Sequence, residues 1–169
     1  IDSAGERLSF KGGDIGLNGL AQFFRNYSLI SGIVPRISLV LGPCIGVSAV
    51  VPVLSDFSII HRQTGFLWLG GDKHSDDAGT AEFHMEKSGQ CDLIAASDED
   101  AIAQAKKLLS FLPQNCWEKP PVVEMGDNPE RRKEDLLDIM PDDPRLTYDI
   151  HEIIARVVDN GEFFELKQD

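Results

Sequence analysis

Apolar positions follow two different periods along most of the chain. One stretch near the start has its large apolar residues at helical spacing, so we expect a helix that ends near Gly32. Its apolar positions are Leu17, Leu20, Phe23 or Phe24, Tyr27 and Ile30. Four shorter runs are rich in β-branched and aromatic residues and are typical of strands. These runs are RISLVL, SDFSIIH, TGFLWLGG and CDLIAA. We also expect a buried helix from Val47 to Leu54, and strands that alternate with helices predict an α/β layered fold.

The clearest local pattern is a helix that begins after Ser97. Asp100 follows this serine three residues later, as in a capping box. The expected apolar face consists of Ile102, Ala105, Leu108, Leu109 and Leu112. Pro113 disfavours helical geometry in the residue before it, so we expect the helix to end at Leu112.

Beyond Trp117 the apolar pattern weakens. We therefore divide the chain into a compact core, residues 1–118, and an extension of linker and helices, residues 119–169. In the extension, RRKEDLLDIM predicts a short polar helix, and Asp149 can cap a last helix. The apolar side of that helix would consist of Ile150, Ile153, Ile154 and Val157.

The apolar run RISLVLGPCIGVSAVVP is interrupted by Gly-Pro-Cys-Ile-Gly. We expect a strand that stops at a Gly42-Pro43 turn and a helix that begins a few residues later. Backbone N–H groups at a helix start have no acceptor within the helix and carry the positive end of its dipole, which suits an oxyanion. The alternative is that Gly42 and Gly46 only permit a tight turn before a buried helix, and spacing alone leaves both possibilities open.

Charge and cysteine usage narrow the function classes. The formal net charge is −12, with 28 acidic against 16 basic residues. This balance argues against a nucleic-acid partner, which would need clustered Lys and Arg. Cys44, Cys91 and Cys116 form no CxxC pair, so we expect neither a disulfide framework nor a zinc knuckle, but a reducing compartment. No window reaches the length of a membrane span. The chain does not begin with Met, and we expect it to be a piece of a longer protein.

Two other kinds of chemistry find little support. A polar stretch contains residue types that bind metals, but their spacing fits no standard ligand motif. These residues are His74, Asp76, Asp77, Glu82 and His84. The serines that we considered as nucleophiles, Ser3, Ser48 and Ser55, do not lie in a Gly-x-Ser-x-Gly motif. We therefore expect neither a metal site nor a hydrolase.

Several stretches, in collinear order, resemble one known family. They are DSAGERL, GIVPRISLVLGPCIGVSAVVPVLSDF, KSGQCDLIAASDEDAIAQAKKLLSFLPQN and PDDPRLTYDIHEIIARVVDNGEFFEL. Together they resemble the carboxyltransferase (β) subunit of biotin-dependent acyl-CoA carboxylases, of the propionyl-CoA and methylcrotonyl-CoA type. The resemblance implies an α/β fold of the crotonase-like (ClpP/crotonase) superhelical ββα type, of which this chain is a partial domain.

The resemblance also implies a site. In the family, a carboxyl group moves from carboxybiotin to the α-carbon of an acyl-CoA, through a thioester enolate held by backbone amides. The matching positions for these amides are Gly46 and Val47, where the family has a Gly-Gly pair. The positions implied to bind acyl-CoA are Gly5, Arg7, Gly42, Cys44, Gly70, Gly71 and Gly79.

The chain departs from the family pattern at three places. Val47 replaces a glycine, and would be strained if that position needed a positive φ. Glu6 adds a carboxylate beside an anionic cofactor. The segment after Gly71 is shorter than is usual in the family, and it normally reaches the acyl pocket. His84 matches a family histidine, and we expect Arg36 and Lys87 to lie near phosphates.

The resemblance finally implies partners. They are acyl-CoA, a biotin carboxylase, a biotin carboxyl carrier subunit that presents the carboxybiotin, and further copies of the chain in a trimer or hexamer. The implied location is the cytoplasm, or the mitochondrial matrix of a eukaryote. Two alternatives stay open: a biotin-dependent acyl-CoA decarboxylase subunit, which runs the chemistry in reverse, and a non-catalytic assembly scaffold of the same family.

Overall fold

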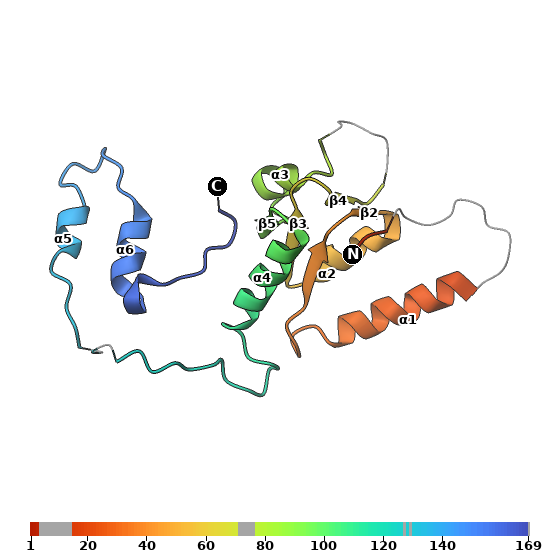
Figure 1. Cartoon of the computed structure of the whole chain (residues 1–169), viewed down its shortest axis with the longest axis horizontal. Coiled ribbons are helices and arrows are strands. Elements are labelled where there is room, and N and C mark those ends of the chain that lie inside the picture. Colours follow the sequence, from red (N-terminus) through yellow and green to blue (C-terminus); the bar gives the residue numbers. More distant parts are fainter. Residues whose placement is uncertain (4–14, 71–76, 127, 129, 169) are drawn as a thin grey trace. The chain divides into compact units, whose positions relative to one another are not determined.

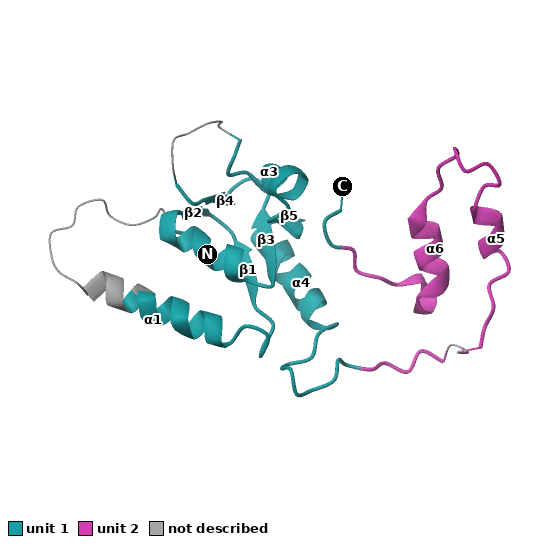
Figure 2. Cartoon of the chain, turned by 180° about the vertical axis from the view of Figure 1, so that it is seen from behind, with its two compact units in different colours: residues 1–121, 166–169 teal, residues 122–165 magenta. Residues whose placement is uncertain are grey.

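The chain folds into two compact units. The computed structural model describes residues 1–3, 15–70, 77–126, 128 and 130–168, and only the backbone of residues 15–18 and 20. Unit 1 consists of Ile1–Pro121 and Leu166–Asp169, and unit 2 consists of Val122–Glu165 (Figure 2). The division at residues 1–118 and 119–169 drawn from the sequence stays a prediction.

Unit 1 contains the strands (Figure 1). Its strands are β1 (Ile37–Val40), β2 (Pro43–Ile45), β3 (Phe57–His61), β4 (Phe66–Trp68) and β5 (Leu93–Ala95). Its helices are α1 (Ile15–Leu29), the 3-10 helix η1 (Gly46–Ala49), α2 (Val50–Leu54), α3 (Ala81–Phe83), the π-helical turn η2 (His84–Ser88) and α4 (Asp98–Leu109). The helix expected to end near Gly32 is confirmed, and so are the four strands expected from apolar runs.

The strands of unit 1 form two parallel sheets. The larger has the order β1-β3-β5, with Ile37 opposite Phe57 and Ile59 opposite Leu93. The smaller pairs β2 with β4, with Cys44 opposite Leu67. The sequence had placed only a turn at Pro43, so β2 corrects that prediction. The strand has only three residues, which is too short to give a recognisable apolar pattern, and it is stabilised by pairing with β4.

The core lies around the strands. Ile59, Ile60 and Val40 are fully buried, and β3 is buried at four successive positions. Strands of parallel sheets are usually covered on both faces. This explains why apolar and polar residues do not alternate at the end of the run SDFSIIH, which forms β3. Helices α2 and α4 both contact β1 and β3, and α4 also contacts β5.

The polar segment before β5 is partly helical. Its residues 81–88 form α3 and η2. Thr80 caps α3, since its side chain accepts a hydrogen bond from the Phe83 N–H. Ala81 and Met85 are buried, which supplies the apolar contact that the segment's composition conceals.

Helix α4 begins as expected but ends earlier. The Ser97 side chain accepts a hydrogen bond from the Asp100 N–H, so the predicted N-cap is confirmed. The helix ends at Leu109, and tighter turns follow up to Leu112. The predicted apolar face is wrong in part, because Leu108 is buried but Ile102 and Leu109 are exposed.

Unit 2 has little interior. It contains α5 (Leu136–Ile139), α6 (Ile150–Val157) and the 3-10 helix η3 (Asp159–Gly161). Asp149 caps α6 by accepting a hydrogen bond from the His151 N–H, as predicted. Among the residues of unit 2 that the structure describes, none is buried, so the amphipathic side of α6 has no core to pack against within the unit.

Candidate functional site

Two of the predicted site residues lie at one edge of the smaller sheet. The carboxyl ends of parallel strands meet at the same edge, and Ile45 at the end of β2 lies opposite Trp68 at the end of β4. Gly46 follows Ile45 directly, and Gly70 comes two residues after Trp68. The structure therefore brings Gly46 and Gly70 to one edge, although 23 residues separate them in the sequence.

Gly46 makes the corner between β2 and η1. Its φ is +67°, in the left-handed region that glycine adopts without strain. No atom lies within 4 Å of the position that a Cβ would occupy on it. Open space thus adjoins the main chain at the first residue of η1, where N–H groups have no acceptor within the helix. Such a corner can accommodate an oxyanion against the backbone.

Val47 adopts an ordinary backbone conformation. Among the non-glycine residues that the structure describes, only Asn160 and Lys167 have positive φ. The positive φ of the corner falls on Gly46 instead, so a β-branched residue at position 47 is not strained. The valine side chain is half-buried, and it adds bulk where the family has a glycine.

The first three residues lie alongside β2. The Ser3 N–H donates to the Pro43 carbonyl at 2.5 Å, and the Ile45 N–H donates to the Ser3 carbonyl at 3.2 Å. The Ser48 hydroxyl donates to the Ser3 hydroxyl at 3.0 Å, which links this segment to η1. The start of DSAGERL therefore flanks the corner. Gly5, Glu6 and Arg7 fall outside the described residues, so their roles stay predictions.

Gly42 and Cys44 face the interior. A Cβ on Gly42 would lie 2.5 Å from the Asp2 carboxylate oxygen Oδ1, so the glycine makes room for that side chain. Cys44 is fully buried, and this burial raises the pKa of its thiol. Their predicted contact with acyl-CoA stays a prediction.

The predicted glycines after β4 differ in their surroundings. Gly70 has φ +109° and open space at its Cβ position, as at Gly46. A Cβ on Gly79 would lie 2.5 Å from Cε2 of the Phe66 ring, and the Gly79 carbonyl accepts from the Leu67 N–H at 2.8 Å. Gly79 is therefore packed against β4, whereas Gly70 faces open space. Gly71 lies outside the described residues.

His84 and the two predicted phosphate-binding bases are held in different ways. His84 bridges the Leu67 carbonyl, 2.9 Å from Nε2, and the Ser88 hydroxyl, 2.8 Å from Nδ1. The Lys87 ammonium lies 5.8 Å from the centroid of the Phe83 ring. Thus His84 attaches η2 to β4, which the sequence did not indicate.

Arg36 is a buried structural residue. It forms an ion pair with Asp56 at 2.8 Å, and it donates to the Tyr27 carbonyl at 3.2 Å and the Ser31 hydroxyl at 3.0 Å. The hydrogen bond from Arg36 lowers the pKa of Asp56. Because these donors are used inside the fold, the expected phosphate contact of Arg36 is not supported.

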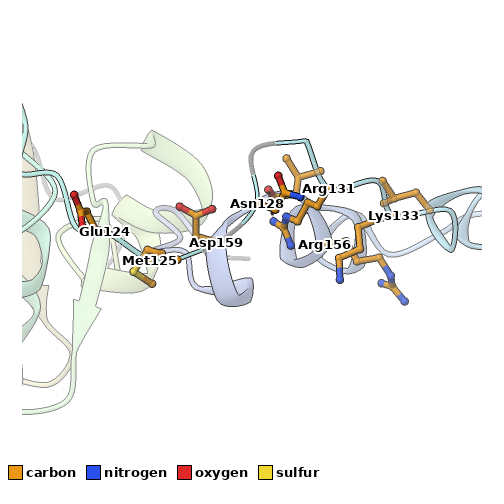
Figure 3. Close-up of a pocket in the computed structure, with 10 residues that line it drawn as sticks. Glu124, Met125, Asn128, Arg131, Lys133, Arg156 and Asp159 are labelled. Carbon is orange, nitrogen blue, oxygen red and sulfur yellow. Dashed lines mark hydrogen bonds between the residues drawn. The ribbon is translucent and has the colours of Figure 1, made fainter.

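One cavity lies in unit 2 and contains no predicted site residue. It has a volume of about 710 Å³, and its lining includes Arg131, Lys133 and Arg156 (Figure 3). The Arg131 guanidinium donates to the Val157 and Val158 carbonyls, and Arg156 Nε donates to Asp135. These arginines hold the unit's own segments together, so the cavity does not have the features of an anion site.

Two kinds of feature are absent from the described part of the chain. In that part, no helix is both long and apolar enough to cross a membrane. The same residues contain no group of three His, Cys, Asp or Glu side chains that could hold a metal ion. His74 and Asp76, which the sequence analysis considered as ligands, lie outside it.

The chain belongs to the carboxyl transferase domain family, whose match covers residues 1–169. Among curated relatives, the propionyl-CoA carboxylase carboxyltransferase subunit of Haloferax mediterranei is 38% identical, over 99% of this chain and 34% of that protein. The methylmalonyl-CoA decarboxylase subunit alpha of Veillonella parvula is 35% identical, over 89% of this chain and 32% of that protein. The chain spans about a third of the length of these relatives.

Solved structures agree with this assignment. Transcarboxylase 12S with hydrolysed methylmalonyl-coenzyme A bound has a TM-score of 0.87 and 35% identity, over 99% of this chain and 34% of its own. The β subunit of Pseudomonas aeruginosa geranyl-CoA carboxylase has a TM-score of 0.59 and 30% identity, over 96% of this chain and 32% of its own. The crotonase-like α/β fold, present as a partial domain, is therefore confirmed, and so is the family resemblance found in the sequence.

Proposed function

We propose that this chain is the part of an acyl-CoA carboxyltransferase that holds the thioester of the acyl-CoA. The carboxyl group moves from carboxybiotin, presented by a partner carrier, to the α-carbon of the acyl group. The observation that carries the proposal is the open corner at Gly46, which has φ +67° and lies at the sheet edge that Gly70 shares. The proposed reaction rests on membership of the family, and the corner is the proposed binding place for the enolate anion of that reaction.

The chemistry requires donors for one oxygen. Loss of the α-proton turns the thioester into an enolate, and the negative charge develops on the thioester oxygen. Backbone amides that are fixed before the reaction stabilise such a charge without reorganisation, and each is worth about 3–4 kcal/mol in the transition state. We assign this role to the N–H groups of Gly46 and Val47.

The side chain of Val47 is proposed to limit the acyl group. It is half-buried beside the corner and unstrained, so its effect is steric rather than conformational. A branched side chain at this position narrows the space next to the amides. We therefore assign short acyl groups to this protein, and we assign its partners and its assembly into a trimer or hexamer from its relatives.

The direction of carboxyl flow has two candidates. Similarity to the decarboxylase subunit of Veillonella parvula, at 35% identity, favours the reverse reaction as the second candidate. Both directions pass through the same enolate, so the corner serves either. The free cysteines Cys44, Cys91 and Cys116 favour a reducing compartment such as the cytoplasm.

The test compares two glycines with the same backbone conformation. Gly46→Ala and Gly32→Ala both place a methyl group at a φ near +70° in open space. Each costs about 1–2 kcal/mol of backbone strain, because alanine disfavours this region. We expect only Gly46→Ala to lower kcat for carboxylation, by about 10²–10³-fold, because it displaces the amides from the enolate oxygen.

The assay uses the full-length protein with its carrier and biotin carboxylase, and propionyl-CoA as the probe. Gly32→Ala should retain kcat within about two-fold, because Gly32 follows α1 and does not belong to the corner between β2 and η1. Equal rates for the two variants would refute the role of Gly46. Absence of saturable propionyl-CoA binding by the unmodified protein would instead favour a non-catalytic scaffold.

A further inference from the structure

The chain turns back on itself after α6. Asn160 and Gly161 have positive φ, 53° and 71°, and make the turn. A Cβ on Gly161 would lie 3.3 Å from the Ala155 carbonyl oxygen, so the returning chain lies close to the helix there. Glu165 then reaches His151 near the start of α6, with 2.7 Å between Oε1 and Nε2. Residues 161–165 therefore run back along α6 towards its beginning.

His151 lies between two carboxylates. Its Nδ1 is 2.8 Å from Asp149 Oδ1, and its Nε2 is 2.7 Å from Glu165 Oε1. Asp149 also caps the helix through the His151 N–H, at 2.9 Å. A carboxylate only accepts hydrogen bonds, and a neutral imidazole has one N–H. Both contacts can be hydrogen bonds only when the ring carries two N–H groups and a positive charge.

We propose that protonated His151 is a latch that fastens residues 161–165 to the start of α6 and opens when the ring loses its proton. When the ring is neutral, one carboxylate faces a ring nitrogen without a hydrogen, and that contact becomes repulsive. Phe163 lies between the turn and the latch, with its ring stacked on His151 at a centroid distance of 6.0 Å. Opening the latch also removes the cationic partner of this stack.

The surrounding charges set the direction of the pH dependence. Glu165 and then Asp149 raise the pKa of His151 above its ordinary value of 6.5. The neighbouring Glu152 is directed to Arg156 instead, with 3.5 Å between Oε2 and Nη1. The pKa is raised in the folded state, so the contribution of the latch to stability is full below pH 6.5 and is lost as pH rises through the raised pKa.

The latch fixes the chain just before it attaches to unit 1. Lys167 follows Glu165 by two residues, and its Nζ lies 3.1 Å from Asp92 Oδ1. With the latch closed, only Leu166 separates the held segment from Lys167, and with the latch open residues 161–165 lose their contact with the start of α6. The inference does not depend on the proposed carboxyltransferase activity.

The experiment measures one histidine and one peptide in the full-length protein. Hydrogen exchange at the C2 carbon of histidine, followed by mass spectrometry, gives the pKa of His151. Amide exchange of the peptide that contains residues 161–165, corrected for its intrinsic pH dependence, reports whether the latch is closed. The variants are Glu165→Gln and, as a control, Glu162→Gln, which removes the same charge from an exposed position in the same segment.

We expect the pKa of His151 to lie above 6.5 and to fall in Glu165→Gln but not in Glu162→Gln. Amide exchange of residues 161–165 should become about two- to five-fold faster above that pKa, as expected for loss of an exposed ion pair. In Glu165→Gln the exchange should be fast at every pH. A pKa that is the same in Glu165→Gln and the unmodified protein, or amide exchange that does not change with pH, overturns the proposal.

Discussion

Individual glycines in this chain serve two separate purposes. Gly46 and Gly70 have positive φ and open space, so the backbone conformation requires them. Gly42 and Gly79 have no such φ, but neighbouring side chains occupy the space of a Cβ. The sequence predicted a ligand contact at all four, with a tight turn as the alternative for Gly42 and Gly46. The structure separates them, because only the first pair leaves the main chain accessible.

A substitution at Gly79 tests the second purpose. Gly79→Ala places a methyl group against the Phe66 ring, where the added Cβ would lie 2.5 Å from Cε2. We expect a loss of about 1–3 kcal/mol in the free energy of unfolding, as for overpacked cores. The thermal unfolding midpoint of the purified full-length protein measures this loss.

The matched control is Gly19→Ala. Gly19 lies within α1 and has no atom within 4 Å of its Cβ position. Alanine is the better helix former by about 1 kcal/mol, so this variant should keep or raise the midpoint. An unchanged midpoint in Gly79→Ala would show that the Phe66 ring moves aside without cost.

Single elements were predictable where the signal lies in neighbouring residues. Ser97 and Asp100 identified the start of α4, and the pair is bonded in the structure at 3.1 Å. Strand β2 was missed because its stability comes from pairing with β4, more than 20 residues away. The π-helical turn was missed because its buried residue, Met85, has polar neighbours. Thr80, which caps α3, was an available signal.

The N-cap of α4 provides a test at this scale. Ser97→Ala removes the acceptor for the Asp100 N–H and should cost about 1 kcal/mol, whereas Ser97→Asp should restore most of it. Amide exchange in the first turn of α4 should become about five-fold faster in Ser97→Ala, since about 1.4 kcal/mol corresponds to a tenfold change. Equal exchange rates for the alanine and aspartate variants would contradict the assigned cap.

At the scale of the whole molecule, the family was predictable and the exposure of side chains was not. The collinear motifs identified the carboxyl transferase family, whose match covers residues 1–169. Periodicity alone placed Ile102 and Leu109 on a buried face, but both are exposed. Helical spacing identifies a possible apolar face, whereas burial depends on which segments pack against it.

The lack of buried residues in unit 2 leads to a prediction about its stability on its own. None of its described residues is buried, and Leu137 is 82% exposed. A peptide of residues 122–165 should therefore be largely unfolded in water, because short helices such as α6 need tertiary packing. Circular dichroism during heating should show no cooperative transition. A cooperative transition would mean that the unit stabilises itself without a buried core.

The attachment of Lys167 to Asp92 has a consequence for how this protein can change in evolution. The residues before and after unit 2 both belong to unit 1, so residues 122–165 form a loop whose two ends are fixed to the same unit. The entropic cost of closing such a loop grows only with the logarithm of its length, and doubling the length costs about 0.6 kcal/mol. Insertions and deletions in residues 122–130 should therefore change the free energy of unfolding little. Related proteins can vary the length of this loop while the parallel sheets keep their geometry.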